Sequence, residues 1–170
     1  MLQLKPLNQP DAEKEYAFFQ HFPPENGFLN PYLGMSKEEF VNTAIPLRLQ
    51  YAQGIGLPPG CVPDTYYFLW LGDNIVGNFK LRHCLNDFLR NGSGHIGFGI
   101  LPEYRGQGFA TQGMAMAVRE LCHMPDFSDD EIYFSCLKSN PASLRVIQKN
   151  GGVIHHQDED SFYLRIPVPR

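Results

Sequence analysis

The spacing of apolar residues changes along the chain, and each change of period predicts a new element of secondary structure. Apolar and polar residues alternate over residues 1–7, which predicts a first strand. Residues 8–11 include Pro10 and indicate a turn and the start of a helix, because proline suits the first helical position. This helix is expected to run to about Phe22, where two consecutive prolines end it.

A second helix is expected over residues 37–53. Ser36, followed three residues later by a glutamate, has the spacing of a capping box and marks its start. Pro46 lies inside this stretch and should kink or split the helix, because proline lacks a backbone N–H. Loops rich in proline and glycine flank it at residues 23–35 and 54–63, and the first of these also carries aromatic side chains.

Strand-like patterns begin near residue 65. The expected strands are residues 66–71, 75–83 and 95–101, the first two joined by a hairpin turn at residues 72–74 and the last two by a polar connection at residues 84–93. Gly97 and Gly99 interrupt the third strand. Glycine weakens a strand, so the pair indicates a bulge or the close approach of another backbone or a ligand.

The last third alternates between helices and strands. A helix from Gly106 to about His123 has its apolar residues on one face, and a strand follows at residues 131–137. Asn140 and Pro141 are start signals for a short helix that Gly151 ends. Strands at residues 153–156 and 162–168 complete a mixed α/β (α+β) domain.

Composition narrows the class of protein. With 170 residues, 43% hydrophobic and 19% charged, the chain can bury one core, and we expect one domain. The net charge of −4 argues against nucleic acid as a partner. Four scattered cysteines lack a C-x-x-C pair, and no apolar stretch is typical of a signal peptide or a membrane span. We therefore expect a soluble cytoplasmic protein with no membrane partner.

The most informative segment is FGILPEYRGQGFAT, residues 98–111, where a strand leads through a glycine-rich turn directly into a helix. Gly106 and Gly108 leave no side chain between the backbone and an incoming group. The first N–H groups of a helix have no internal partners and point outward, so the turn can bind a phosphate or pyrophosphate. A tight turn without a ligand is the alternative. Neither G-x-x-x-x-G-K-[ST] nor G-x-G-x-x-G is present.

Residues 105–110 read R-x-x-G-x-A, and this segment resembles the hallmark of the GNAT acetyltransferase superfamily. A strand at residues 132–137, then Asn140 and a helix ending in KNGG, is similar to the second cofactor-contacting segment of that family. The resemblance implies a splayed, mostly antiparallel central sheet flanked by helices. It covers residues 65–168 as a cofactor-binding core, with residues 1–64 contributing the first strand and the acceptor-side helices and loops of a single domain spanning 1–170.

The resemblance also implies acetyl-CoA as co-substrate, held in the wedge between residues 98–101 and 132–137. The backbone N–H near Ile100 would stabilise charge on the thioester oxygen, and the N–H groups from Gly106 to Thr111 would hold the pyrophosphate. The residues expected to contact the cofactor are Phe98, Gly99, Ile100, Arg105, Gly106, Gln107, Gly108, Phe109, Ala110, Thr111, Asn140 and Ser143.

The sequence departs from the family pattern at the acid and base. Many members have a Tyr seven residues after the position of Asn140, where this chain has Ile147, and some have a Glu where it has Ser135. Ser135 could order a water but is a poor base. His83 and His95 remain candidate bases, although a surface or structural histidine explains each as well.

For other polar residues, both a ligand-binding role and simple exposure to solvent are compatible with the sequence. Glu25 could bind an acceptor ammonium or be solvated, and Arg145 and Lys149 could meet a CoA phosphate or face water. The run from His155 to Asp160 is better explained as a polar hairpin turn than as a metal site, so no metal is expected.

These observations predict an enzyme that acetylates the amine of a small molecule or amino-acid-like acceptor. The acidic chain mildly favours a cationic amine over an anionic acceptor, and a peptide N-terminus is the second choice. The alternative from another class is a non-catalytic acetyl-CoA sensor or interaction module. Residues 23–63 are expected to form much of the acceptor pocket, and either a monomer or a homodimer is compatible with the sequence.

Overall fold

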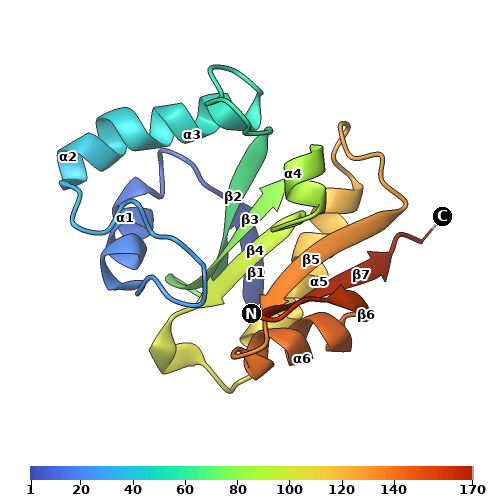
Figure 1. Ribbon diagram of the computed structural model, residues 1–170. Coiled ribbons are helices and arrows are strands. Elements are labelled where there is room, and N and C mark those ends of the chain that lie inside the picture. Colours follow the sequence, from blue (N-terminus) through green and yellow to red (C-terminus); the bar gives the residue numbers. More distant parts are fainter. Residues whose placement is uncertain (170) are drawn as a thin grey trace.

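A computed structural model describes residues 1–169, whose strands form two sheets (Figure 1). The four-stranded antiparallel sheet has the order β1-β2-β3-β4, and the three-stranded antiparallel sheet has the order β5-β7-β6. The strands are β1 (Leu2–Pro6), β2 (Asp64–Leu71), β3 (Asn74–Arg82), β4 (Ile96–Ile100), β5 (Glu131–Leu137), β6 (Val153–Gln157) and β7 (Ser161–Pro167). The expected hairpin is β2–β3, and the mixed α/β fold with an antiparallel sheet flanked by helices is confirmed.

Helices cover both faces of the four-stranded sheet, and each face has its own hydrophobic cluster. One cluster joins α1 and its aromatic residues to β2, and the other joins α5 to β3 and β5. The helical segments are α1 (Ala12–His21), α2 (Lys37–Glu39), η1 (Phe40–Ala44), α3 (Ile45–Ala52), α4 (Asp87–Arg90), η2 (Pro102–Tyr104), α5 (Phe109–Cys122) and α6 (Pro141–Lys149).

The helix that contains Pro46 continues through the proline by changing its hydrogen-bond pattern. Ser36 Oγ accepts from the N–H of Glu39 at 3.1 Å, as the capping signal predicts. The five residues of η1 form a π-helical turn just before Pro46. Because Pro46 has no N–H to donate, a wider turn at this point accommodates the missing bond.

The connection between β3 and β4 contains a short helix that was not predicted from the sequence. The N–H of Leu89 donates to Asn86 Oδ1 at 2.9 Å, which caps α4, and the Leu89 side chain is buried. Asn86 was the available signal, because asparagine is a favoured helix cap.

The two sheets meet where β4 begins. Gly94 and Phe134 form an isolated bridge, and the N–H of His95 donates to the carbonyl of Tyr133 at 2.7 Å. A Cβ at Gly94 would lie 2.1 Å from that carbonyl oxygen, which is too close for any side chain. The φ of Gly94, +68°, also favours glycine. Beyond this contact β4 and β5 belong to separate sheets, as a splayed sheet requires (Figure 1).

Candidate active-site cavity

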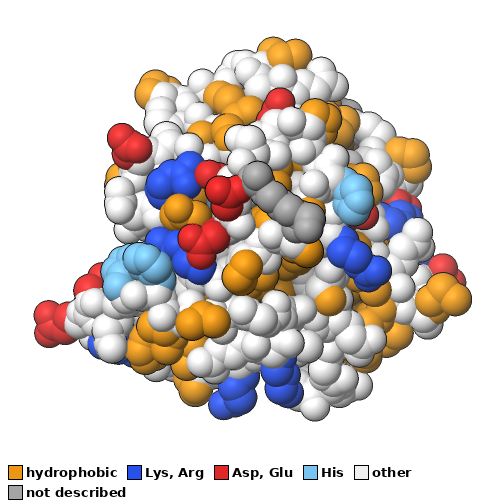
Figure 2. All heavy atoms as spheres, turned by 90° about the vertical axis from the view of Figure 1, so that its right-hand side faces the viewer, with side chains coloured by type: hydrophobic (Ala, Val, Ile, Leu, Met, Phe, Trp, Pro, Cys, Tyr) orange, Lys and Arg blue, Asp and Glu red, His pale blue; other side chains and the backbone are white. Residues whose placement is uncertain are grey.

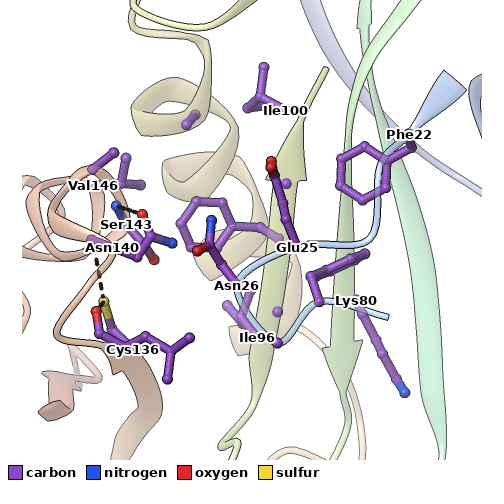
Figure 3. A pocket seen from close by; sticks show the side chains of 18 of the residues that line it. Phe22, Glu25, Asn26, Lys80, Ile96, Ile100, Cys136, Asn140, Ser143 and Val146 are labelled. Carbon is purple, nitrogen blue, oxygen red and sulfur yellow. Dashed lines mark hydrogen bonds between the residues drawn. The ribbon is translucent and has the colours of Figure 1, made fainter. Parts of the chain in front are cut away.

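A cavity of about 900 Å³ extends from the wedge between β4 and β5 to the loop after α1. Figure 3 shows that loop passing in front of β4, with Asn140 on one side and Lys80 on the other. The structure brings the following predicted site residues to the cavity wall: Phe98, Gly99, Ile100, Arg105, Gly106, Gly108, Phe109, Ala110, Thr111, Ser135, Asn140 and Ser143. Gln107 is exposed and is not among the lining residues.

The glycine-rich turn presents a run of unpaired backbone donors to the cavity. The N–H of Arg105 donates to Pro102, and that of Gln112 donates to the carbonyl of Gly108. Within residues 1–169, the N–H groups of residues 106–111 have no protein acceptor. They lie at the positive end of the α5 dipole, so the turn is suited to an anion.

Backbone conformation explains both glycines of this turn. Gly106 has φ +74° and Gly108 has φ +81°, which residues with a side chain rarely adopt. A Cβ at Gly106 would meet no protein atom within 4 Å, and one at Gly108 would meet only the Gln112 side chain at 3.9 Å. A side chain there would therefore project into open space beside the unpaired donors.

One edge of β4 remains free for an extended ligand. Leu101 N–H donates to Val76 and Arg82 N–H donates to His95 across the β3–β4 ladder. In this antiparallel pairing alternate residues bond to the partner strand, so Phe98 and Ile100 direct their backbone groups away from β3 toward the wedge. The carbonyl of Ile100 accepts from Arg105 Nε at 2.9 Å, while its N–H faces the cavity.

Arg105 also joins the turn to the acceptor-side loop. Its guanidinium forms an ion pair with the carboxylate of Glu25. Glu25, which we considered as a partner for an acceptor ammonium, is therefore engaged by the protein itself.

Gly99 of β4 makes room for an aromatic ring, and Gly97 lies in ordinary contact with a second ring. A Cβ at Gly99 would lie 2.2 Å from the Phe22 ring, and one at Gly97 would lie 3.6 Å from the Phe28 ring. Phe22 and Phe28 pack edge to face with ring centroids 5.3 Å apart. The close approach that the sequence indicated is that of the loop after α1.

The β5–α6 segment forms the opposite wall. Asn140 Oδ1 accepts from the N–H of Ser143 at 3.3 Å and caps α6, and Cys136 Sγ lies 3.5 Å from the Asn140 carbonyl (Figure 3). Arg145 and Lys149 line the cavity, whereas Ile147 is 1% exposed and belongs to the hydrophobic core. The residue seven positions after Asn140 thus faces the core in this chain.

The candidate histidine bases lie outside the cavity lining. His95 is fully buried, and burial lowers its pKa to about 4, against a smaller opposing effect of Asp129, to which Nε2 bonds at 3.0 Å. Burial also lowers the pKa of His83, whose Nε2 lies 2.8 Å from Thr65 Oγ1. Both histidines are structural.

Two tyrosines near the wedge differ in their position relative to the cavity. Tyr104 lines the cavity, whereas Tyr133 packs against the Arg165 guanidinium at 3.8 Å and does not. The loop at residues 54–63 does not line the main cavity. Part of it borders a separate hollow of about 310 Å³.

The described residues contain neither a cluster of potential metal ligands nor a membrane-spanning helix. Within residues 1–169 no group of three or more potential ligands is placed to hold a metal ion. His155 and His156 belong to β6, and in the turn that follows Asp158 Oδ1 accepts from the N–H groups of Asp160 and Ser161. No helix of the described residues is long and apolar enough to cross a membrane.

Comparison with known proteins gives the same family as the motif. A family model described as an acetyltransferase (GNAT) domain matches residues 59–153. No curated protein matches the chain. Among solved structures, the ribosomal-protein-S5-alanine acetyltransferase from Vibrio fischeri has a TM-score of 0.72 at 14% identity, covering 98% of this chain and 92% of its own.

Two other solved structures show the range of acceptors in this fold. A ribosomal L7/L12 α-N-protein acetyltransferase in complex with coenzyme A has a TM-score of 0.65 at 16% identity, covering 98% of this chain and 94% of its own. A chimera of the spermidine N-acetyltransferase from Vibrio cholerae has a TM-score of 0.63 at 18% identity, with 98% and 95% covered.

Proposed function

Since the chain belongs to the GNAT acetyltransferase family, we propose that it transfers the acetyl group of acetyl-CoA to the amine of a small, amino-acid-like acceptor. The observation that carries this proposal is the cavity that joins the unpaired donors of residues 106–111 to the loop after α1. One end suits an anionic cofactor and the other suits an acceptor.

The cofactor end offers charge as well as backbone donors. The pyrophosphate would lie on the N–H groups of residues 106–111, with Arg145 and Lys149 on the opposite wall as additional cations. The pantetheine chain would pair with the free edge of β4 as an added strand does, through the backbone groups of Phe98 and Ile100.

The same edge supplies the electrostatic part of catalysis. The N–H of Ile100 faces the cavity and would donate to the thioester oxygen as negative charge develops on it. One preorganised donor of this kind lowers a barrier by about 3 kcal/mol. Positioning an amine beside a thioester supplies most of the remaining acceleration, because the thiolate is a tolerable leaving group.

Water and weakly acidic side chains would remove the proton of the amine and protonate the departing sulfur. Ser135 lines the cavity and can hold a water that accepts the proton of the amine. Three tyrosines line the cavity, Tyr32, Tyr66 and Tyr104, and Tyr104, which directly precedes Arg105 of the glycine-rich turn, would donate to the departing sulfur. The absence of a carboxylate base at position 135 agrees with a reaction that depends mainly on positioning.

A peptide N-terminus is the second candidate acceptor, supported by two structural neighbours that acetylate ribosomal proteins. Acetyl-CoA incubated with polyamines, amino acids, aminoglycosides and N-terminal peptides separates the possibilities when free thiol is followed. Thiol release with small amines supports the proposal. Turnover confined to peptides would reject it, and tight CoA binding without any turnover would indicate a sensor.

A further inference from the structure

The charge inside the cavity is opposite to the charge of the chain. Six of the side chains that line the cavity are Lys or Arg. Among the described lining residues the single acidic side chain is Glu25, which forms an ion pair with Arg105. The chain as a whole has a net charge of −4. On the outer face shown in Figure 2, basic and acidic side chains are interspersed. Positive charge is therefore concentrated in the cavity. Its cations are Arg48, Lys80, Arg82, Arg105, Arg145 and Lys149.

Three of these cations come from α3 and β3 and not from the glycine-rich turn or α6, and they form what we call the acceptor cation cluster, Arg48, Lys80 and Arg82. Lys80 pairs with Tyr66 on one side and with Gly97 on the other, across β2, β3 and β4. Directly opposed residues share a sheet face, so the Lys80 side chain lies on the face of β4 on which the Phe28 ring packs against Gly97. Figure 3 shows Lys80 extending from β3 away from Ile100.

The cluster is not neutralised within the protein. Asp64 forms an ion pair with Arg48, whose side chain is 10% exposed and packs on the Tyr66 ring at 4.0 Å. Lys80 Nζ lies 3.6 Å from the same carboxylate and gains less from it. Asp64 borders the smaller hollow and not the main cavity, whereas Lys80 and Arg82 line both. Arg48 and Lys80 thus share one carboxylate, and Arg82 Nη1 donates instead to the backbone carbonyl of Gly94.

The titration of Lys80 agrees with this imbalance. Burial, and then the charges of Arg82 and Arg48, lower the pKa of Lys80 to about 8. A bound anion would relieve the repulsion among the three cations, and it would be met by partly buried charged donors that form strong hydrogen bonds.

We propose that the acceptor cation cluster binds a carboxylate or phosphate of the acceptor, so that the substrate is an amine carrying an anionic group at its far end. Gly97, opposite Lys80, is three residues from Ile100, which is about 10 Å along a strand. The amine at the thioester and the anionic group at the cluster are therefore separated by a chain of several atoms. This inference rests on the proposed acetyl transfer and names its substrate class.

The test uses four six-carbon amines that differ at one end: aminohexanoate, aminohexyl phosphate, aminohexanamide and hexanediamine. With the full chain and acetyl-CoA, we expect kcat/KM for the carboxylate or the phosphate to exceed that for the amide by about 10-fold or more. The diamine should be the poorest acceptor. Equal rates for all four, or preference for the diamine, would overturn the proposal.

Variants separate binding from a structural role. Lys80→Gln should raise KM for the anionic acceptors about 10-fold, while KM for the amide and Kd for CoA stay unchanged. Lys80→Arg should restore the preference for the anionic acceptors. Arg82→Gln is the second variant, should Lys80→Gln fail to fold. Lys14→Gln, which removes a cation outside the cavity, is the matched control. An equal loss for all four acceptors in both cluster variants would contradict the proposal.

A binding measurement keeps the two proposals distinct. If no amine is acetylated, the proposed function fails, and calorimetry of the CoA-loaded protein with the N-acetyl derivatives of aminohexanoate and aminohexanamide still decides the anion site. Binding of the carboxylate at least about 10-fold tighter than the amide, lost in Lys80→Gln, supports the site. Equal affinities overturn it.

Discussion

The Nδ1 atom of His95 accepts a hydrogen bond from the backbone N–H of Tyr133 at 2.9 Å, at the point where β4 and β5 part. The carbonyl of Tyr133 in turn accepts from the N–H of His95. The imidazole thus supplies an acceptor that a neighbouring strand would otherwise provide, and it holds the two sheets together above the wedge. Its Nε2 carries the proton and donates to Asp129.

This arrangement predicts a loss of stability in acid. Burial lowers the pKa of His95 from 6.5 to about 4, so the unfolded chain binds a proton more readily than the folded one. The free energy of unfolding should therefore fall as pH decreases from about 6.5 to about 4, by on the order of 2–3 kcal/mol. Urea unfolding of wild type and His95→Gln over this range measures the effect. An equally steep dependence in the variant would contradict it, and exposed His155→Gln is the control.

A buried carboxyl in α1 predicts the opposite trend at higher pH. Glu15 is fully buried, and burial raises its pKa to about 8 although its Oε1 accepts from the N–H of Asn8. Because the folded pKa is above the unfolded value of 4.5, stability should fall as pH rises from about 4.5 to about 8. Glu15→Gln should flatten this slope in thermal unfolding. Glu13→Gln, at an exposed position of the same helix, should leave the slope unchanged.

A side chain at Gly108 should abolish cofactor binding. Gly108→Val places a branched side chain beside the donors of residues 106–111 and strains a left-handed backbone by about 1–2 kcal/mol. We expect CoA affinity in calorimetry to fall at least about 100-fold while the circular dichroism spectrum is retained, as expected when an anion loses backbone donors. Gly56→Val, with φ +67° and an open surrounding, is the matched control for strain. Unchanged CoA affinity in a folded Gly108→Val protein would rule out the cradle.

No single side chain is expected to act as an indispensable acid. Tyr104→Phe should lower kcat by less than about 100-fold, because general acid catalysis of a required step contributes at least that much. A larger loss, accompanied by a shifted pH–rate profile, would identify Tyr104 as a dedicated donor. Ile147→Tyr does not test this point, since Ile147 lies in the core and the ring would overpack it.

Local signals predicted the parts of the molecule that depend on neighbouring residues. The β2–β3 hairpin, the Asn140 cap with Pro141, and the Gly106–Gly108 turn all result from short-range chemistry. The sequence could not show that the loop after α1 fills the space above Gly97 and Gly99, because that contact joins residues about seventy positions apart.

The acceptor cation cluster was hidden for a similar reason. Arg48 comes from α3, whereas Lys80 and Arg82 are alternate residues of β3, and only the fold brings them to one cavity. Net charge averages over the whole surface and so indicated a cationic acceptor, whereas the local field in the cavity favours an anionic group.

We propose that this cavity moves an acetyl group from acetyl-CoA to an amine. Acetyl-CoA labelled with carbon-13 in the acetyl group, incubated with the full chain and the acceptor panel, tests it directly by NMR of the product. We expect an amide-bonded acetyl on the acceptor nitrogen, formed by wild type and not by Gly108→Val. Release of the label only as free acetate, at a rate independent of every amine, would contradict it.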